Sequence, residues 1–233
     1  MILTIITVCF QNAQQLEVTI ANVAAVKREG ISYIVIDGGS TDATLELLRQ
    51  NEGIIDRWVS EPDSGIYDAM NKGWILADPK SRIIFLGAGD RLLSLPGNLE
   101  QYSNSEIIYG DVMVGARRFH SVSDYRFRFS NTVHHQALLI PKCLHPDPPF
   151  DLKFRVYSDY DFNLRLLRMG GCYVYDPDLI GYAEPGGLSA NKQHGENFMV
   201  VKKNFGLTWA LCAAAFLTFR KLLECIGIRL LTP

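Results

Sequence analysis

The sequence has little net charge and few cysteines, and both shortages exclude classes of protein. The 233 residues carry 23 Lys and Arg against 25 Asp and Glu, a formal net charge of −2, and the pI is near 6.2. Nucleic-acid-binding domains normally show a basic surface, so this class is set aside. The five cysteines stand at long spacings without a CxxC pair. They predict neither a zinc site nor a disulfide framework, and they favour a reducing compartment.

Other missing features concern membranes and nucleotides. The N-terminus lacks the basic leader and cleavage site of a signal peptide, so Ile2–Val8 is expected to be a buried strand. The turn after this strand contains no GxGxxG, which argues against a dinucleotide-binding protein. No GxxxxGK[ST] phosphate loop occurs either. Any nucleotide phosphates must therefore be held in another way.

The first ninety residues alternate short apolar runs with helical patterns. Strands are predicted at Ile2–Val8, Tyr33–Asp37, Ile54–Val59 and Ile83–Leu86, and helices at Gln14–Arg28, Asp42–Gln50 and Gly65–Ala77. This alternation predicts an α/β fold with a parallel sheet and right-handed crossovers. Ligands bind such sheets at the carboxyl ends of the strands, so the polar residues just beyond each strand form the candidate site.

The regularity fades after residue 90. Strands are predicted at Ile107–Val114 and His135–Ile140, a Pro-rich loop at Lys142–Pro149 and a helix at about Asp159–Met169. No internal repeat occurs, and no linker clearly divides the chain. One domain is therefore expected, which is usual for an α/β chain of this length.

Two strand ends carry single carboxylates beside glycines. In residues 33–42 (YIVIDGGSTD), Asp37 can accept hydrogen bonds from a ribose or a base, and the glycines let a ligand approach the backbone. A structural alternative is that Ser40 or Thr41 caps the next helix. In residues 85–90 (FLGAGD), Asp90 offers the hard oxygen ligand that suits Mg²⁺ or Mn²⁺. Asp is also common in turns for its local hydrogen bonds alone.

A third segment, residues 60–73 (SEPDSGIYDAMNKG), lies between these two, and residues 5–12 (IITVCFQN) precede them. In this order the segments resemble the nucleotide-binding half of family 2 glycosyltransferases, particularly bacterial members that assemble exopolysaccharide or lipopolysaccharide. The resemblance runs from about residue 2 to residue 205. It implies a GT-A fold, with a Rossmann-like, mostly parallel sheet flanked by helices. Residues 1–90 would bind the nucleotide sugar, residues 91–205 the acceptor, and residues 206–233 would form a tail.

The resemblance also implies roles for single residues. The positions that would border the donor are Thr7, Val8, Phe10, Asp37, Asp68, Asn71, Lys72, Ala88 and Gly89. Asp90 matches the last acid of the family's metal-binding motif, so a divalent cation, Mg²⁺ or Mn²⁺, is expected to bridge the donor diphosphate. The chain departs from the family twice. Many members carry a second acid where this chain has Gly38, and an earlier acid in the segment where it has Gly87-Ala-Gly.

Residues 157–165 (YSDYDFNLR) begin the late helix with two acids. The segment looks like the family's ED motif, in which Asp159 takes the position of the base that deprotonates the acceptor hydroxyl during an inverting transfer. Acids in a first helical turn are also stabilised by the helix dipole, which is a purely structural reason for their presence. Asp161 faces elsewhere on the helix, and it is expected to brace the fold or to pair with Arg165.

Two further segments are weaker candidates. His135 and Gln136 resemble a His-Gln pair of many relatives, and they are candidates for contact with the acceptor or the diphosphate; a structural histidine is the alternative. Residues 186–194 (GGLSANKQH) suit a lid over the donor phosphates, to which His194 or Lys192 would contribute.

The tail differs in composition from the rest. Leu207–Phe219 has thirteen residues without charge, whereas a bilayer span needs roughly 20. The basic residues that flank it are Lys202, Lys203, Arg220, Lys221 and Arg229. They predict a helix in the membrane interface, and the alternative is a helix packed on the core or on a second subunit.

Together these features predict an inverting glycosyltransferase of cell-surface polysaccharide synthesis, cytoplasmic and peripheral at the inner face of the membrane. A UDP-sugar is the expected donor by family association, although no residue excludes GDP or dTDP, and the acceptor would be a saccharide or lipid-linked. Two alternatives stay open. A nucleotidyltransferase should show a glycine-rich basic loop near the N-terminus, whereas a non-catalytic sugar-nucleotide-binding subunit of a membrane complex needs no base. A homo-oligomer is also compatible with the sequence.

Overall fold

The computed structural model describes residues 2–186 and 194–225. Its strands are β1 (Leu3–Cys9), β2 (Ile31–Asp37), β3 (Arg57–Ser60), β4 (Arg82–Gly87), β5 (Arg91–Ser94), β6 (Glu106–Val114), β7 (Arg117–Phe119), β8 (Leu138–Pro141) and β9 (Cys172–Ala183). Its α-helices are α1 (Ala13–Val26), α2 (Thr44–Gln50), α3 (Ile66–Leu76), α4 (Ser158–Arg168), α5 (His194–Phe205) and α6 (Leu207–Cys225). Three 3₁₀ turns are η1 (Tyr125–Arg128), η2 (His135–Ala137) and η3 (Lys142–Leu144).

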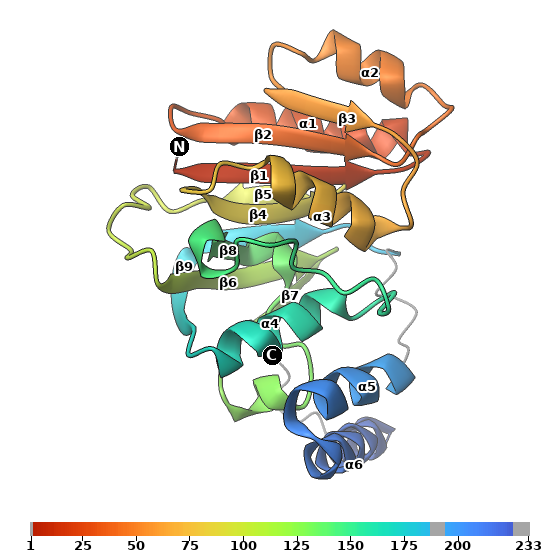
Figure 1. Ribbon diagram of the computed structural model, residues 1–233, viewed down its shortest axis with the longest axis vertical. Helices are drawn as coiled ribbons and strands as arrows, with labels where there is room; N and C mark the ends of the chain where they lie inside the picture. Colours follow the sequence, from red (N-terminus) through yellow and green to blue (C-terminus); the bar gives the residue numbers. More distant parts are fainter. Residues whose placement is uncertain (1, 187–193, 226–233) are drawn as a thin grey trace.

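The described strands form one sheet in the order β3-β2-β1-β4-β8-β6-β9-β5, with β7 paired to β6. β1 pairs in parallel with β2 and β4, and β2 pairs in parallel with β3, which confirms the predicted parallel arrangement. β8 runs antiparallel to both β4 and β6 (Figure 1). It therefore joins the early, regular half of the sheet to the late half.

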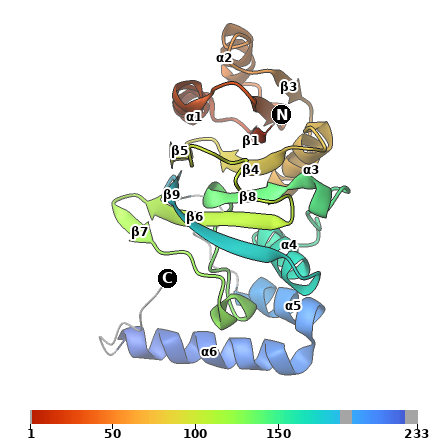
Figure 2. The ribbon, with the colours of Figure 1, turned by 90° about the vertical axis from the view of Figure 1, so that its left-hand side faces the viewer.

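Helices cover both faces of the sheet. All seven residues of β1 are buried, and they alternate between two hydrophobic clusters, with Leu3 and Ile5 in one and Ile6 and Val8 in the other. The first cluster includes the buried positions 16, 20 and 23 of α1, and the second includes positions 67, 70 and 74 of α3. These spacings follow the helical period, so each helix buries one face. Figure 2 shows α1 and α3 on opposite sides of β1.

Two elements differ from the sequence expectation. The predicted strand His135–Ile140 begins as the 3₁₀ turn η2, and only Leu138–Pro141 is extended. The long strand β9 was not predicted, because Pro177 and Gly181 interrupt its pattern. Its pairing with β6 shifts register between Tyr109 and Asp111, and this irregularity accommodates the proline.

The C-terminal helices α5 and α6 pack at the end of the molecule away from β3 (Figures 1 and 2). α6 contacts the body through buried Ala210 and Ala213, and the rings of Trp209 and Phe216 lie 5.8 and 5.4 Å from that of Phe129. One face of the tail helix is thus packed on the core. Of the helices that the structure describes, none combines the length and the apolar character that a membrane crossing requires.

Candidate active site

The candidate site lies where four parallel strands end. Cys9 of β1 lies beside Asp37 of β2, Asp37 lies beside Ser60 of β3, and Val8 of β1 lies beside Gly87 of β4. The loops that follow these strands therefore meet at one edge of the sheet. Most of the donor residues expected from the sequence stand in these loops or just before them.

Asp37 organises this edge from the inside. Its carboxylate is fully buried and accepts hydrogen bonds from the Ser40 backbone N–H (2.9 Å), the Ser40 hydroxyl and the Ser60 hydroxyl (2.6 Å). Ser40 is thereby bound to Asp37 rather than to the start of α2, where no side-chain cap is found. Because this carboxylate is fully buried, Asp37 shapes the loop that follows β2. A direct contact between Asp37 and a nucleoside stays a prediction.

The three candidates at the end of β1 differ in exposure. Thr7 is fully buried and its hydroxyl accepts a hydrogen bond from the Tyr33 hydroxyl (3.1 Å), and Val8 is buried in the core. Phe10 lies just beyond the strand and is 61% exposed. Of these three side chains, only that of Phe10 is presented to a ligand.

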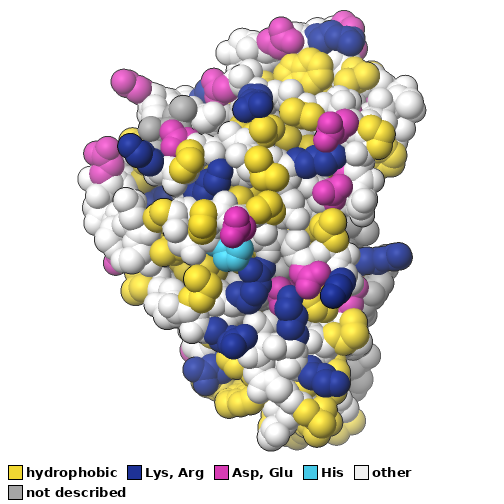
Figure 3. Space-filling model, in the orientation of Figure 1, with side chains coloured by type: hydrophobic (Ala, Val, Ile, Leu, Met, Phe, Trp, Pro, Cys, Tyr) yellow, Lys and Arg dark blue, Asp and Glu magenta, His cyan; other side chains and the backbone are white. Residues whose placement is uncertain are grey.

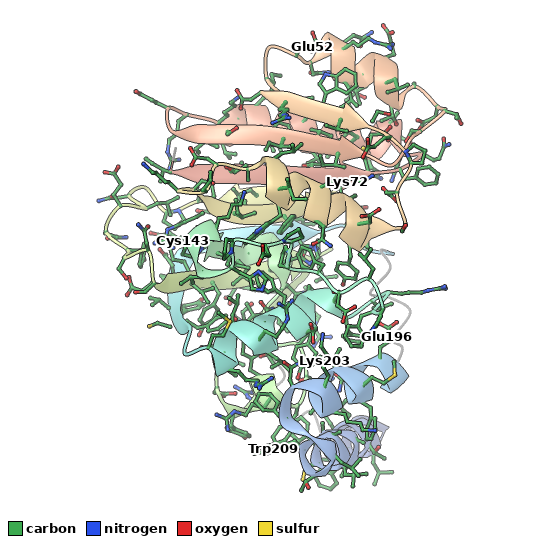
Figure 4. The ribbon with its side chains drawn as sticks, in the orientation of Figure 1. Glu52, Lys72, Cys143, Glu196, Lys203 and Trp209 are labelled. Carbon is green, nitrogen blue, oxygen red and sulfur yellow. The ribbon has the colours of Figure 1, made fainter. Side chains whose placement is uncertain are left out.

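The three candidates on α3 hold neighbouring loops. Asp68 accepts the Ser64 N–H (2.9 Å), and Asn71 exchanges two hydrogen bonds with the backbone of Phe150 (2.8 and 2.9 Å). Lys72, labelled in Figure 4, donates to the Pro62 carbonyl and pairs with Glu61 (both 2.9 Å). These contacts fix the loop between β3 and α3 and the segment around residue 150. Direct donor contacts of these side chains stay a prediction.

Asp90 joins three segments that are distant in sequence. One carboxylate oxygen accepts the Glu184 N–H (2.9 Å), and the other accepts the Gly87 N–H (2.8 Å) and the Gln136 side-chain amide (3.0 Å). The expected candidates Asp90 and Gln136 are therefore adjacent. The carbonyl oxygen of the Gln136 side chain is buried and has no hydrogen-bond partner in the described structure.

Close packing explains why the residues before Asp90 are small. A Cβ at Gly87 would lie 3.2 Å from the Asp90 carboxylate, and one at Gly89, where φ is +96°, would lie 3.0 Å from both Gln15 and Glu184. The space beside Gly89 is therefore occupied by protein side chains and is not open to a ligand. Ala88 is half-buried beside it.

The residues around Asp90 fit a divalent cation only if the protein supplies few of its ligands. Of about four lone-pair positions on a carboxylate, three accept protein hydrogen bonds, so Asp90 can offer one. No cluster of three or more acidic, histidine or cysteine ligands occurs among the described residues. Mg²⁺ and Mn²⁺ tolerate one or two carboxylates when substrate phosphates supply the rest. Glu184, which no sequence pattern marks, is a second acid beside this turn, because its Cβ and Cγ pack against Gly89.

Asp159 lies in the first turn of α4 and has four hydrogen-bond or ion-pair partners. One oxygen accepts the Tyr67 hydroxyl (3.1 Å) and the Tyr160 N–H (2.8 Å). The other accepts the Asn131 side-chain amide (3.1 Å) and faces Nδ1 of His135 at 3.5 Å. Its side chain is 13% exposed. Tyr67 and Asn131 carry no sequence signal for this role, since only the fold brings them to α4.

Asp159 and His135 form a charged pair. Burial alone would raise the pKa of Asp159, but the hydrogen bond and charge of His135 outweigh it, so this pKa lies below its usual value. Burial lowers the pKa of His135, but Asp159, with a smaller contribution from Asp90, raises it overall. Burial and the neighbouring His135 lower the pKa of His134 to about 4. Of the two histidines, His135 is therefore the one that holds a positive charge more readily.

The pair also sets a pH window for stability. Folding raises the pKa of His135, so its contribution is fully present below the ordinary value of 6.5 and is lost as the pH rises through the raised pKa. Folding lowers the pKa of Asp159, so its contribution is present above 3.8 and is lost as the pH falls through the lowered pKa. Both contributions are present in full between these two ordinary values.

Comparison with known proteins places the chain in a family. Residues 4–92 match the family model described as glycosyl transferase family 2. A "PGL/p-HBAD biosynthesis glycosyltransferase" of Mycobacterium bovis is 32% identical over 174 residues. That match covers 67% of this chain and 66% of the relative, just under two thirds of its length. The chain belongs to glycosyltransferase family 2. An uncharacterised glycosyltransferase of Mycobacterium tuberculosis is 40% identical over 90 residues, 38% of this chain and 34% of the relative.

Solved structures confirm the GT-A fold of this family 2 chain. Staphylococcus aureus TarS superposes with a TM-score of 0.65 at 14% identity, over 86% of this chain and 39% of TarS. The mannosyltransferase PcManGT of Pyrobaculum calidifontis, in complex with GDP-Man and Mn²⁺, superposes with a TM-score of 0.60 at 14% identity, over 97% of this chain and 79% of that protein.

In this family 2 chain, buried charges fix α4. Asp161 is fully buried and pairs with Arg165 (3.1 Å), as expected, and also with Lys203 (2.9 Å) and the Asn204 amide (2.9 Å) of α5. Lys203 thus forms ion pairs within the protein, although its side chain is 40% exposed. A place for it at a membrane surface stays a prediction. Glu196 of α5, missed from sequence, accepts the N–H groups of residues 155, 156 and 157 (2.9, 2.8 and 3.2 Å) (Figure 4). It holds the segment that leads into Asp159.

Two expectations fall partly or wholly outside the described residues. The predicted lid, residues 186–194, includes the undescribed positions 187–193, among them Lys192. His194 begins α5, but its side chain is not described. A role of this segment in donor binding stays a prediction.

Removing the Glu196 carboxylate should loosen the approach to Asp159. We expect Glu196→Ala to lower the free energy of unfolding by about 2 kcal/mol, because three N–H groups lose a charged acceptor. Amide hydrogen exchange at residues 155–157 should become faster, as measured by mass spectrometry. The matched control is Glu17→Ala on α1, an exposed position where the change should stay within about 0.5 kcal/mol. Unchanged exchange at residues 155–157 would contradict this role.

Proposed function

We propose that this protein transfers a sugar from a nucleotide-sugar donor to a hydroxyl of a saccharide or lipid-linked acceptor, with inversion, in cell-surface polysaccharide synthesis. The observation that carries the proposal is the ionised carboxylate of Asp159, which stands beside the strand-end site and is held by Tyr67, Asn131 and His135. Family membership supports transfer chemistry. TarS has been solved with UDP-GlcNAc and PcManGT with GDP-Man, which supports a nucleotide-sugar donor.

The proposed chemistry is a direct displacement. The acceptor oxygen attacks the anomeric carbon, its proton passes to Asp159, and the bond from that carbon to the diphosphate breaks. The four partners of Asp159 fill its lone-pair positions, so the acceptor hydroxyl must replace one of them. The His135 contact is the longest at 3.5 Å and is the one most readily replaced. Once displaced from Asp159, the His135 cation would remain beside the reacting groups.

We expect Asp159→Asn to lower the transfer rate by at least about 100-fold, since general-base catalysis typically contributes that much. The Kd of the donor, measured by calorimetry, should stay the same. Asp147→Asn, at an exposed position in the loop before α4, is the matched control and should transfer normally. Full biological activity of Asp159→Asn would instead support a non-catalytic sugar-nucleotide-binding subunit.

A divalent cation, Mg²⁺ or Mn²⁺, fits the proposal through Asp90, with Glu184 as a second oxygen ligand. When bound, it would neutralise charge on the leaving diphosphate. PcManGT has been solved with Mn²⁺, which supports this choice. The residues of this chain then have two tasks, to hold the ion through Asp90 and to keep the Gly87–Asp90 turn in place.

Metal dependence can be tested by thermal unfolding. We expect UDP or GDP to raise the Tm of the natural protein more with Mn²⁺ than with EDTA, because binding to the native state stabilises it. Asp90→Asn should abolish the extra shift relative to its own Tm, and Glu184→Gln should reduce it. Asp178→Asn, an exposed acid on β9, is the control. Equal shifts with Mn²⁺ and EDTA in the natural protein would contradict the metal proposal.

We also propose that α6 docks the protein on an anionic membrane surface at the cytoplasmic face. Its outer face carries a stripe of exposed apolar side chains, Leu207, Leu211, Phe219 and Leu222, which are 54 to 61% exposed. Charge favours an anionic lipid surface over a second copy, since the α6 segment 207–225 contains Arg220 and Lys221 against one acid, Glu224. Exposed Lys202 precedes the helix, and Arg128 lies over the Trp209 ring. In Figure 3, Lys and Arg side chains gather over the lower half and hydrophobic ones lie at the lower end.

Vesicle sedimentation tests this attachment. The natural protein should bind phosphatidylglycerol-containing vesicles more than phosphatidylcholine vesicles, and less at high salt, because salt screens the charges. Leu211→Gln/Phe219→Gln should lose most of this binding. Ile75→Gln/Leu93→Gln, which changes exposed apolar residues of α3 and β5, is the matched control. A dimer that the first pair converts to monomer, without any vesicle binding, would show that the stripe covers a second copy.

A further inference from the structure

The loop between β3 and α3 places a carboxylate above Gly38, the position where many relatives carry a second acid. A Cβ at Gly38 would lie 2.6 Å from Oδ2 of Asp63. Real side chains do not approach so closely, so any residue other than glycine would push Asp63 away. The space that a side chain at 38 would occupy is therefore filled by Asp63 from a neighbouring loop.

Several contacts hold this loop against the end of β2. The Glu61 N–H donates to the Asp37 carbonyl (3.1 Å), and the Ser60 hydroxyl donates to the Asp37 carboxylate (2.6 Å). A Cβ at Gly39, where φ is +84°, would lie 3.1 Å from the Pro62 nitrogen. The two loops are thus in direct backbone contact, and Asp63 keeps a fixed place relative to the strand ends.

The two oxygens of Asp63 differ in their partners. Oδ1 accepts the Gly65 N–H (2.8 Å), which closes a local turn. Within the described part of the chain, no hydrogen bond to Oδ2 is found, and the side chain is half-buried. Asp37 differs because both of its oxygens are used inside the protein. Asp63 therefore offers a free acceptor oxygen at this edge of the sheet, unlike Asp37.

An exposed aromatic ring borders the same point. Cδ2 of Phe10 lies 3.2 Å from the position of a Cβ at Gly38, the same point that Oδ2 of Asp63 approaches, and the ring is 61% exposed. An exposed aromatic ring and a free carboxylate oxygen beside it match the face and the edge of a nucleobase. The ring can stack on the base, and the carboxylate can accept an N–H from its edge.

We propose that Asp63 selects the base of the donor nucleotide by accepting its ring N–H, while Phe10 stacks on it. This inference rests on the proposed function and concerns the same site. Uracil and thymine carry a ring N–H between two carbonyls, and guanine carries a ring N–H beside an amino group. Cytosine and adenine present a lone pair at the matching ring nitrogen, which a carboxylate repels. Asp63 thereby selects uridine, thymidine and guanosine diphosphates over those of cytidine and adenosine.

Calorimetric titration of the full chain with UDP, GDP, CDP and ADP, in the presence of Mn²⁺, tests this selection. The natural protein should bind UDP and GDP at least about tenfold more tightly than CDP and ADP, because a bound base would enclose Oδ2 of Asp63, and leaving this acceptor unpaired costs that much. Asp63→Asn keeps the Oδ1 acceptor for Gly65 and replaces Oδ2 by an N–H donor. It should weaken UDP binding by about 10- to 100-fold and should bring the Kd of CDP level with that of UDP or below it.

Two further variants separate the roles. Phe10→Ala should weaken all four nucleotides by a similar factor, about 5- to 100-fold, because stacking does not depend on the base edge. Glu46→Gln, which removes an exposed charge on α2, is the matched control and should bind as the natural protein does. Equal binding of UDP and CDP by the natural protein, or an unchanged preference in Asp63→Asn, would overturn the inference while the proposed function stands. Binding of none of the four would overturn both.

Discussion

The carboxylate of Asp90 holds the two halves of this site together. It accepts hydrogen bonds from Gly87 at the end of β4, from Gln136 in the turn before β8 and from Glu184 at the end of β9. Hydrogen bonds to a charged group contribute about 1.5 to 3 kcal/mol each, so this residue strongly fixes the junction. Without it, the strand ends that face a donor would lose the side-chain bond to the turn that carries His135, and the pairing of β4 with β8 would be left to connect them. The residue expected to bind metal is thus also a structural centre.

The position of the proposed catalytic base, Asp159, depends on contacts between α4 and α5. Glu196 of α5 binds the backbone just before α4, and Asp161 binds Lys203 and Asn204 of α5. Asp161 is buried, so its ion pairs do more than the weak exposed pair that an (i, i+4) spacing alone suggests. These contacts fix the rotation and depth of α4, and with them the direction in which Asp159 points. The helix that follows in sequence therefore positions the first turn of the helix before it.

The sequence predicted the structure well wherever a local hydrophobic period or a single motif determines the element. The parallel strands β1 to β4 follow from buried apolar runs, and the Asp161–Arg165 pair follows from helical spacing. It was a poor guide where the decisive contact joins distant segments. The long strand β9 was hidden by Pro177, which only the irregular pairing with β6 makes tolerable. Similarly, Tyr67 and Asn131 reach Asp159 across 92 and 28 residues of sequence, and no local pattern marks them.

The two departures from the family pattern have a common physical reading. At Gly38 and in the Gly87–Asp90 turn, the chain lacks an acid that many relatives carry, and at both places a glycine lets an acid from another loop come close. Asp63 fills the space above Gly38, and the Glu184 side chain packs on Gly89. A side chain at either glycine would displace the acid that covers it. The glycine and the distant acid therefore form one unit, so restoring the family's acid at 38 alone should disturb the site rather than improve it.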